Sequence, residues 1–513
     1  QGYSSAASDV YKRQIYKIIF SSLILMGLMT SCFDKFLEED VYDFLSPNNF
    51  YKTEADAEAA VNAIYSRLVS SEDNDISFHR AALMIGEYPA ECSSAQTSTV
   101  PYRLAFEFYT WTPNTDGIEL VWKFFYQVVF RTNVAIENIP NIGGDPAKIK
   151  RLEGEARFMR GLAYLYLIRL FDNVPLTTAS EQDDQNLPNM GTSDAVFKQI
   201  IEDLTFAESA LPDSYTGTDV GRATKGAAQA FLAKTYLTMA GYPWNKTENY
   251  ALAAAKCEDI IKSGNYDLDP NYAMNFKEAG EHNKEYIFDA EFQQNLNGSN
   301  WVNMSSIRDQ NVCGMAGWSS FGGTMNFYED MLKNNPGDKR LATNIILSFI
   351  DTKTGEEKIW GKDFDVNKGL VHTWKYIDPE ETGVGDQNSN LNYHFTRYAD
   401  VLLMHSEAVN NATGFSGSYD KYYGINLVRE RAGLAGITNL DKDAFNKALI
   451  WERVVELCYE GHLWYDYKRM NCMEERVARK GVNIGTDKKY YVYPIPVNEL
   501  SRNPKLEQHP LWK

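Results

Sequence analysis

The stretch GLAYLYLIRL, residues 161–170, lies within Lys148–Phe171, a segment whose apolar periodicity predicts one long helix. A second stretch, GAAQAFLAKTYL, begins 65 residues later (226 minus 161) and also mixes small residues with Leu and Tyr. Two tetratricopeptide units would give a spacing of about twice 34 residues. The usual Trp and Gly-Tyr markers of that repeat are absent, so the period alone is a weak signal. Small residues nevertheless let paired helices approach closely, and the sequence predicts a mainly α fold of tetratricopeptide-like helix pairs, an α-α superhelix.

Helical patterns occur on both sides of a long irregular segment. Residues 265–395 are rich in Gly, Asn, Asp and aromatic residues and have little helical periodicity. That length is too great for a plain connection, so we expect a variable, loop-rich ligand-binding region there. The predicted organisation is a signal peptide over residues 1–31, a tether over 32–47, an N-terminal helical region over 48–264, the loop-rich region over 265–395 and a C-terminal helical region over 396–513.

The N-terminal stretch LILMGLMTSCFDKFLEED, Leu23–Asp40, has an apolar run that stops at a cysteine. Basic residues precede the run, which is roughly 12 residues long against the roughly 20 of a membrane-spanning helix. The sequence from Leu28 to Cys32 resembles the lipobox of bacterial lipoproteins, so Cys32 is the predicted lipidation site. The alternative is an ordinary secretory signal with a chance cysteine. Residues 1–14 fit a native signal start poorly, and we expect them to be an artefact.

Charge and cysteine usage exclude several functions. The formal charge is −18, and residues 1–31 carry three basic side chains and one acidic, so the chain from residue 32 has a charge of −20. Without a basic run, binding to nucleic acid or to anionic lipid by charge is disfavoured. The six cysteines include no C-x-x-C pair, so neither a metal site nor a cofactor is predicted. The 32 Tyr and 10 Trp exceed what a helical core requires, which favours surface rings used in recognition.

The segment ERVVELCYEGHLWYDYKRM, Glu452–Met470, resembles a signature of the SusD/RagB family, surface nutrient-binding lipoproteins of Bacteroidetes. Leu463 stands where that family usually has a basic residue, and the closing segment reads Gln508-His509-Pro510-Leu511 in place of Gln-Asn-Pro-Gly. Five further segments resemble the family and follow its order: WKFFYQVVFRTNVAIENIP (122–140), GEARFMRGLAYLYLIRLFDNVPL (154–176), TRYADVLLMHSEAVN (396–410), NLVRERAGL (426–434) and YPIPVNELSRNPKLEQHP (493–510).

The resemblance implies a function and a location. It implies a lipid-anchored protein on the outside of the outer membrane that captures oligo- or polysaccharide for polysaccharide utilisation. It also implies a partner, a SusC-like TonB-dependent transporter, over which the protein acts as a lid. Two alternatives remain: the same lid role for peptides or other cargo, and a periplasmic glycoside hydrolase.

Catalysis has one candidate group of residues. Glu452, Glu456 and Glu460 are spaced as one stripe of a predicted helix, and His462 follows them. The H-E-x-x-H spacing is absent, and no nucleophile or oxyanion arrangement accompanies the carboxylates. We expect these carboxylates to pair with basic residues such as Arg429 and Arg453, and we predict no catalytic residue, no metal ligand and no enzymatic activity.

Glycan binding needs aromatic faces for the apolar side of a pyranose ring and polar side chains for its hydroxyls. The segments Phe78–Trp111 and Asn295–Gly323 offer this mixture, and ligands of the family contact loops from these two regions. A single Trp has about an even chance of being a core residue instead. The predicted ligand-binding residues are Arg80, Tyr102, Tyr109 and Trp111 in the first segment, and Trp301, Asn303, Arg308, Trp318 and Phe321 in the second.

Overall fold

The computed structural model describes residues 50–69, 84–95, 98, 100–181, 186–189, 191–365, 369–385 and 387–513. The predicted signal peptide and tether lie outside the described residues, as do Cys32 and Arg80. The unit Tyr51–Lys513 contains all the elements considered below.

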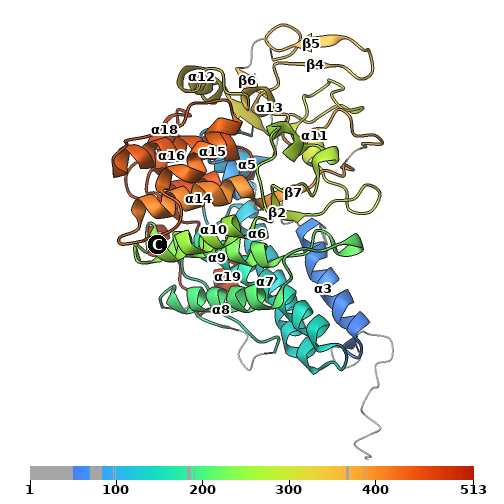
Figure 1. Ribbon diagram of the computed structural model, residues 1–513, viewed down its shortest axis with the longest axis vertical. Coiled ribbons are helices and arrows are strands. Elements are labelled where there is room, and N and C mark those ends of the chain that lie inside the picture. Colours follow the sequence, from blue (N-terminus) through green and yellow to red (C-terminus); the bar gives the residue numbers. More distant parts are fainter. Residues whose placement is uncertain are drawn as a thin grey trace, which may run out of the picture. The chain divides into compact units, whose positions relative to one another are not determined.

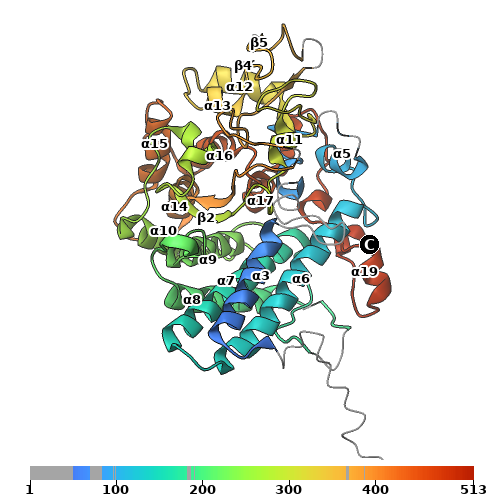
Figure 2. The same ribbon diagram turned by 90° about the vertical axis from the view of Figure 1, so that its right-hand side faces the viewer.

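The N-terminal part is a series of helices in which each packs against the next along the chain (Figures 1 and 2). Two of them contain the GLAYLYLIRL and GAAQAFLAKTYL stretches, and these stretches are buried on nearly every side, as expected of helix segments rich in apolar residues all round. The mainly α prediction with tetratricopeptide-like pairs is confirmed. The helices are α3 (Glu54–Val69), α6 (Asp116–Asn138), α7 (Pro146–Phe171), α8 (Asp194–Ala210), α9 (Lys225–Ala240) and α10 (Asn249–Ser263).

Local sequence explains where these helices begin and how closely they pack. Asp145 accepts a hydrogen bond from the Ala147 amide at the start of α7, which satisfies one of the unpaired donors of a helix N-terminus. At Gly154 an added Cβ would lie 2.8 Å from the Ala210 Cβ, so α7 and α8 meet there because no side chain separates them.

The C-terminal helices continue the same packing, since α10 contacts α14, and α14 contacts both α15 and α16. The sequence pattern predicts one continuous helix from Lys442 to about Met470, and this prediction is wrong. The chain leaves helical geometry after Leu457, and positive φ angles at Tyr459 (69°) and Gly461 (77°) redirect it before the next helix. The helices are α14 (Tyr398–Asn411), α15 (Lys421–Arg431), α16 (Lys442–Leu457), α17 (Leu463–Arg469), α18 (Met473–Ala478) and α19 (Val497–Arg502).

The segments between the two helical series are irregular but contain short elements. Pro101 opens α5 (Pro101–Glu107), a position at which the missing amide hydrogen of proline costs nothing. Short helices in the loop-rich region are α11 (Trp301–Ser305), α12 (Met325–Asn334) and α13 (Leu341–Asn344). In the part of the chain that the structure describes, the strands form one three-stranded sheet and two antiparallel pairs. The sheet has the order β1 (Ser93–Ser94), β3 (Gly322–Thr324), β6 (Leu370–Val371), and the pairs are β2 (Tyr286–Ala290) with β7 (Tyr393–Arg397) and β4 (Ser348–Ile350) with β5 (Glu357–Ile359).

One large apolar core runs through both helical series, and a smaller cluster lies in the loop-rich region. Cys257 on α10 and Cys458, the residue after α16, are buried in the large core. Within the described ranges, no helix has the length and apolar character needed to cross a bilayer. The limits of the loop-rich region, placed after residue 264 and after residue 395, stay predictions.

Candidate functional site

A short antiparallel pairing joins the two segments predicted to bind ligand. β1 lies in the first segment and β3 at the end of the second, and the register pairs Ser93 with Gly323 and Ser94 with Gly322. The Tyr88 hydroxyl also donates to the Ser320 carbonyl at 3.0 Å, across a sequence separation of 232 residues. Two segments that are distant in the sequence therefore lie side by side.

Four of the predicted rings are buried in the core. Trp301 and Phe321 are 0 % exposed, and their centroids lie 5.5 Å apart in an edge-to-face contact. Tyr109 and Trp111 are also in the core, and Trp111 stacks on Tyr493 near the C-terminus at 4.7 Å. The expectation that these rings present their faces at the surface is wrong, because edge-to-face and stacked neighbours already cover them.

The Asn303 side chain is also buried and hydrogen-bonded within the protein. Its side chain is 0 % exposed, and its Oδ1 accepts from the Gln387 amide at 2.8 Å. A buried amide held in this way positions the loop around Gln387 and does not face a ligand.

The remaining described candidates are accessible. Trp318 is half-buried and Arg308 is exposed, and the Arg308 Nε and Nη2 atoms donate to the Trp318 carbonyl at 3.2 and 2.8 Å. Tyr102 on α5 is half-buried, and Phe108, at the end of the same helix, is 51 % exposed. Sequence reasoning missed Phe108, although its place among the aromatic residues of the first segment was a usable signal.

Two titratable side chains, the buried Glu87 and the half-buried Lys480, fix the first segment to the C-terminal helices. Glu87 accepts hydrogen bonds from the amides of Tyr459 (2.7 Å) and Gly461 (3.0 Å), in the turn between α16 and α17. Burial raises the pKa of Glu87 to about 7, although those amides oppose the shift. Lys480 donates to the carbonyls of Tyr88 at 2.7 Å and Ser93 at 2.8 Å, and burial lowers its pKa to about 8.

The candidate catalytic carboxylates belong to a buried ionic cluster. Glu460 lies beyond the end of α16, so the expected three-residue helical stripe is wrong. Arg429 does pair with Glu452 at 2.9 Å, as expected, but Arg453 pairs with Asp400 and Asp466 instead.

We name the whole group the Arg397 cluster, after its most connected member. The centre of the cluster is fully buried. Arg397 contacts Glu285 (2.6 Å), Glu456 (2.6 Å) and Glu460 (2.8 Å). Burial alone would raise the pKa of Glu460, but Arg397 and Lys375 outweigh it and lower that pKa to about 2. The other members of the cluster are Lys375, Arg340, Arg431 and Glu452, with Asp338 and Arg429 at its edge.

His462 is a core residue. Burial, with the nearby Lys234 charge, lowers its pKa to about 3, so the imidazole is neutral at ordinary pH. Among the residues that the structure describes, no group of three or more His, Cys, Asp or Glu side chains is arranged to hold a metal ion.

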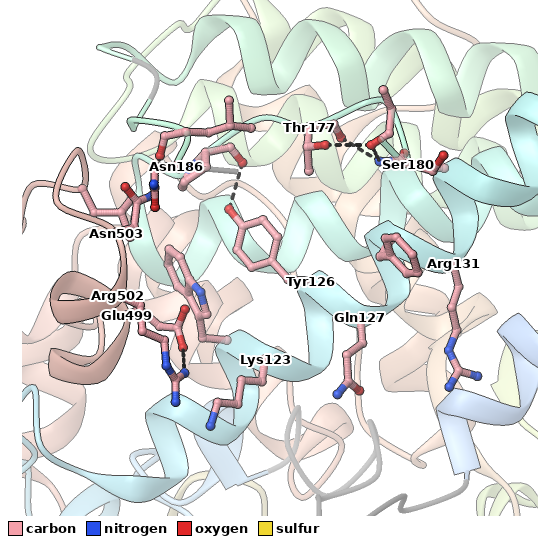
Figure 3. Close-up of a pocket in the computed structure, with 17 residues that line it drawn as sticks. Lys123, Tyr126, Gln127, Arg131, Thr177, Ser180, Asn186, Glu499, Arg502 and Asn503 are labelled. Carbon is pink, nitrogen blue, oxygen red and sulfur yellow. Dashed lines mark hydrogen bonds and ion pairs between the residues drawn. The ribbon is translucent and has the colours of Figure 1, made fainter. Parts of the chain in front are cut away.

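A separate cavity of about 690 Å³ lies against α6, and none of the residues predicted to bind ligand lines it (Figure 3). Trp122, Tyr126 and Phe130 line it from the helix. They recur every fourth residue, a signal that sequence reasoning overlooked.

Comparison with known proteins places the chain in one family. Residues 259–512 match the SusD family, and residues 35–237 match a SusD-like family described as starch-binding and associating with the outer membrane. SusD-like protein P2 of Formosa agariphila is 27% identical over 524 aligned residues, which cover 96% of this chain and 98% of that protein.

Solved structures agree with these matches. A SusD superfamily protein from Parabacteroides distasonis superimposes with a TM-score of 0.78 at 24% identity, and the match covers 89% of this chain and 99% of that one. A laminarin-binding SusD-like protein superimposes with a TM-score of 0.72 at 26% identity, and the match covers 90% of this chain and 100% of that one. The chain belongs to the SusD/RagB family.

Proposed function

We propose that this protein captures oligo- or polysaccharide at the outer membrane and delivers it, uncleaved, to a SusC-like TonB-dependent transporter. The observation that carries the proposal is the pairing of β1 with β3, which joins two loop segments on a helical scaffold. Loops positioned by a rigid scaffold are the usual carriers of binding residues. The family descriptions support a carbohydrate ligand, since a relative binds laminarin and one matched family is described as starch-binding.

The accessible side chains near this junction have the chemistry that a sugar requires. Trp318 exposes part of its indole ring. Arg308 donates to the Trp318 carbonyl, and the exposed Arg308 guanidinium has further N–H donors for sugar hydroxyl groups. Tyr102 and Phe108 provide rings at α5. These four residues are the proposed contacts.

Titration calorimetry tests the ligand class. Laminarin, amylose and xyloglucan are titrated into wild type, Trp318→Ala and Arg308→Ala, with Trp244→Ala as a control that removes a half-buried indole from the α9–α10 connection. We expect at least one glycan to bind, and each loop variant to lose on the order of tenfold in affinity while the control does not.

Two results would overturn the proposal. Absence of binding by every glycan, with a tryptic peptide mixture bound instead, would favour the peptide-carrier alternative. Release of reducing sugar from a bound glycan would indicate a hydrolase.

Cys32 is the proposed lipid-bearing residue. Metabolic labelling of the producing cells with radioactive palmitate should mark the wild-type protein and leave Cys32→Ser unlabelled. Equal labelling of both proteins would exclude Cys32 as the anchor.

A further inference from the structure

The cavity against α6, called the α6 groove below, has a regular aromatic wall. Trp122, Tyr126 and Phe130 occupy one face of the helix, so two steps of four residues separate the outer rings by about 12 Å along the axis. Phe130 is 56 % exposed, and the groove of about 690 Å³ falls in the size range of small-molecule sites.

Hydrogen bonds hold the opposite wall of the groove at a fixed distance from the helix (Figure 3). The Tyr126 hydroxyl donates to the Pro175 carbonyl at 2.8 Å, so its phenol is already engaged. The Asn133 amide donates to the carbonyls of Thr177 and Ala179, each at 3.2 Å. These bonds pre-form the groove, which reduces the entropy that a ligand would lose on ordering it.

The C-terminal end of the chain closes the groove. Asn503, just beyond α19, donates to the Leu187 carbonyl at 2.7 Å. The second wall is therefore tied to both α6 and the C-terminal segment.

The charged side chains that line the groove are Lys123, Arg131, Glu499 and Arg502, and their contacts include two ion pairs. Lys123 lies 2.5 Å from Glu119 and Arg502 lies 2.7 Å from Glu499. A strongly charged ligand would have to compete with these pairs, whereas a fully apolar one would bury the neighbouring amides and hydroxyls without partners. A neutral molecule with both apolar faces and many hydroxyl groups fits this lining better than either.

We propose that the α6 groove binds a short, neutral oligosaccharide, as a second saccharide site lined by residues other than those proposed on the loops. The pyranose faces lie along Tyr126 and Phe130, and the hydroxyl groups pair with the polar side chains of the two walls. This inference rests on the proposed function for its ligand class, but it assigns a site to which the loops do not contribute.

Calorimetry with short oligosaccharides tests the α6 groove on the intact protein. The probes are hexasaccharides of β-1,3-glucan, α-1,4-glucan and β-1,4-glucan. The variants are Phe130→Ala and Tyr126→Leu, which remove the two rings on which the sugar is placed; Trp122, at 4 % exposed, is left intact. Leu252→Ala is the matched control, because it removes an apolar side chain that is 48 % exposed on α10.

We expect two bound molecules per chain for at least one hexasaccharide. Phe130→Ala and Tyr126→Leu should each weaken the same one of the two by on the order of tenfold, and Leu252→Ala should weaken neither. Trp318→Ala should weaken the other one.

The two proposals fail in different ways. Unchanged binding in both Phe130→Ala and Tyr126→Leu, with loss in Trp318→Ala, would overturn the second site and leave the proposed function intact. Absence of binding by all three hexasaccharides would overturn the second site, and the polysaccharide titrations would then decide the proposed function separately.

Discussion

The substitution Arg397→Met should destabilise the fold by about 4 kcal/mol. The guanidinium is 0 % exposed, and five hydrogen bonds connect it to the carboxylates of Glu285, Glu456 and Glu460 and to the Glu456 carbonyl. Methionine has a similar volume, so little of the loss comes from a cavity.

The magnitude follows from the charge balance of the Arg397 cluster. Its cations and anions are equal in number, with five of each. The cations are Arg340, Lys375, Arg397, Arg429 and Arg431, and the anions are Asp338, Glu285, Glu452, Glu456 and Glu460.

Removing Arg397 upsets this balance in a site that water does not reach. The cluster then has all of its anions but one cation fewer, so one carboxylate charge is no longer neutralised. Removing one partner of a buried ion pair costs about 3 to 5 kcal/mol, which is a large fraction of the roughly 5 to 15 kcal/mol that typically separates a folded from an unfolded protein.

Urea unfolding followed by tryptophan fluorescence measures the change in the free energy of unfolding. The matched control is Arg502→Met, whose side chain is 60 % exposed and pairs with Glu499 at the surface, and it should cost less than about 1 kcal/mol. Adding Glu285→Gln to Arg397→Met should recover at least about 1 kcal/mol, because it removes the uncompensated charge. An Arg397→Met protein as stable as Arg502→Met would refute the reasoning.

Three further predictions concern pH and helix packing. The lowered pKa of Glu460 contributes stability that is present above about pH 4.5 and is lost as the pH falls toward 2, so the urea midpoint should drop across that interval. The pKa of Glu87 is raised to about 7, so its protonated carboxyl stabilises the fold at low pH and this contribution is lost as the pH rises. The hydrogen-exchange protection factors of the turn that binds Glu87 should therefore fall between about pH 5 and about pH 8. At Gly424 an added Cβ would lie 2.1 Å from the Leu402 carbonyl oxygen, so Gly424→Ala should cost about 1 to 3 kcal/mol in thermal or urea unfolding, whereas Gly143→Ala, with open space around it, should stay within about 0.5 kcal/mol.

The helical series could be predicted from the sequence because each helix carries its own local signals. The periodicity of Lys148–Phe171, with a terminating Asp172-Asn173-Val174-Pro175, specifies α7 to within two residues of Pro146–Phe171. The break between α16 and α17 could not be predicted in the same way. Apolar residues continue through it, and the turn at Tyr459 is held by the Glu87 carboxylate, which comes from far away in the chain and binds the Tyr459 amide.

The candidate site was harder to predict than the fold, because exposure is decided by contacts between distant segments. Trp301 and Trp318 have similar local surroundings of small and polar residues. The first packs against Phe321 and is covered, and the second stays half-exposed. Composition identified segments rich in aromatic residues, but it could not tell which rings lie inside.

The Arg397 cluster explains how an irregular region can hold a fixed shape. The loop-rich region has few paired strands to satisfy its backbone, so long-range side-chain contacts must set its position. Glu285 precedes β2 and Arg397 ends β7, and Arg397 joins this two-stranded sheet to Glu456 on α16. Lys375 makes a second connection, since its ammonium donates to Glu460 and to the Cys458 carbonyl, each at 2.7 Å. Because these attachments are buried, surface loops such as the one bearing Trp318 can change in sequence without loosening the scaffold that presents them.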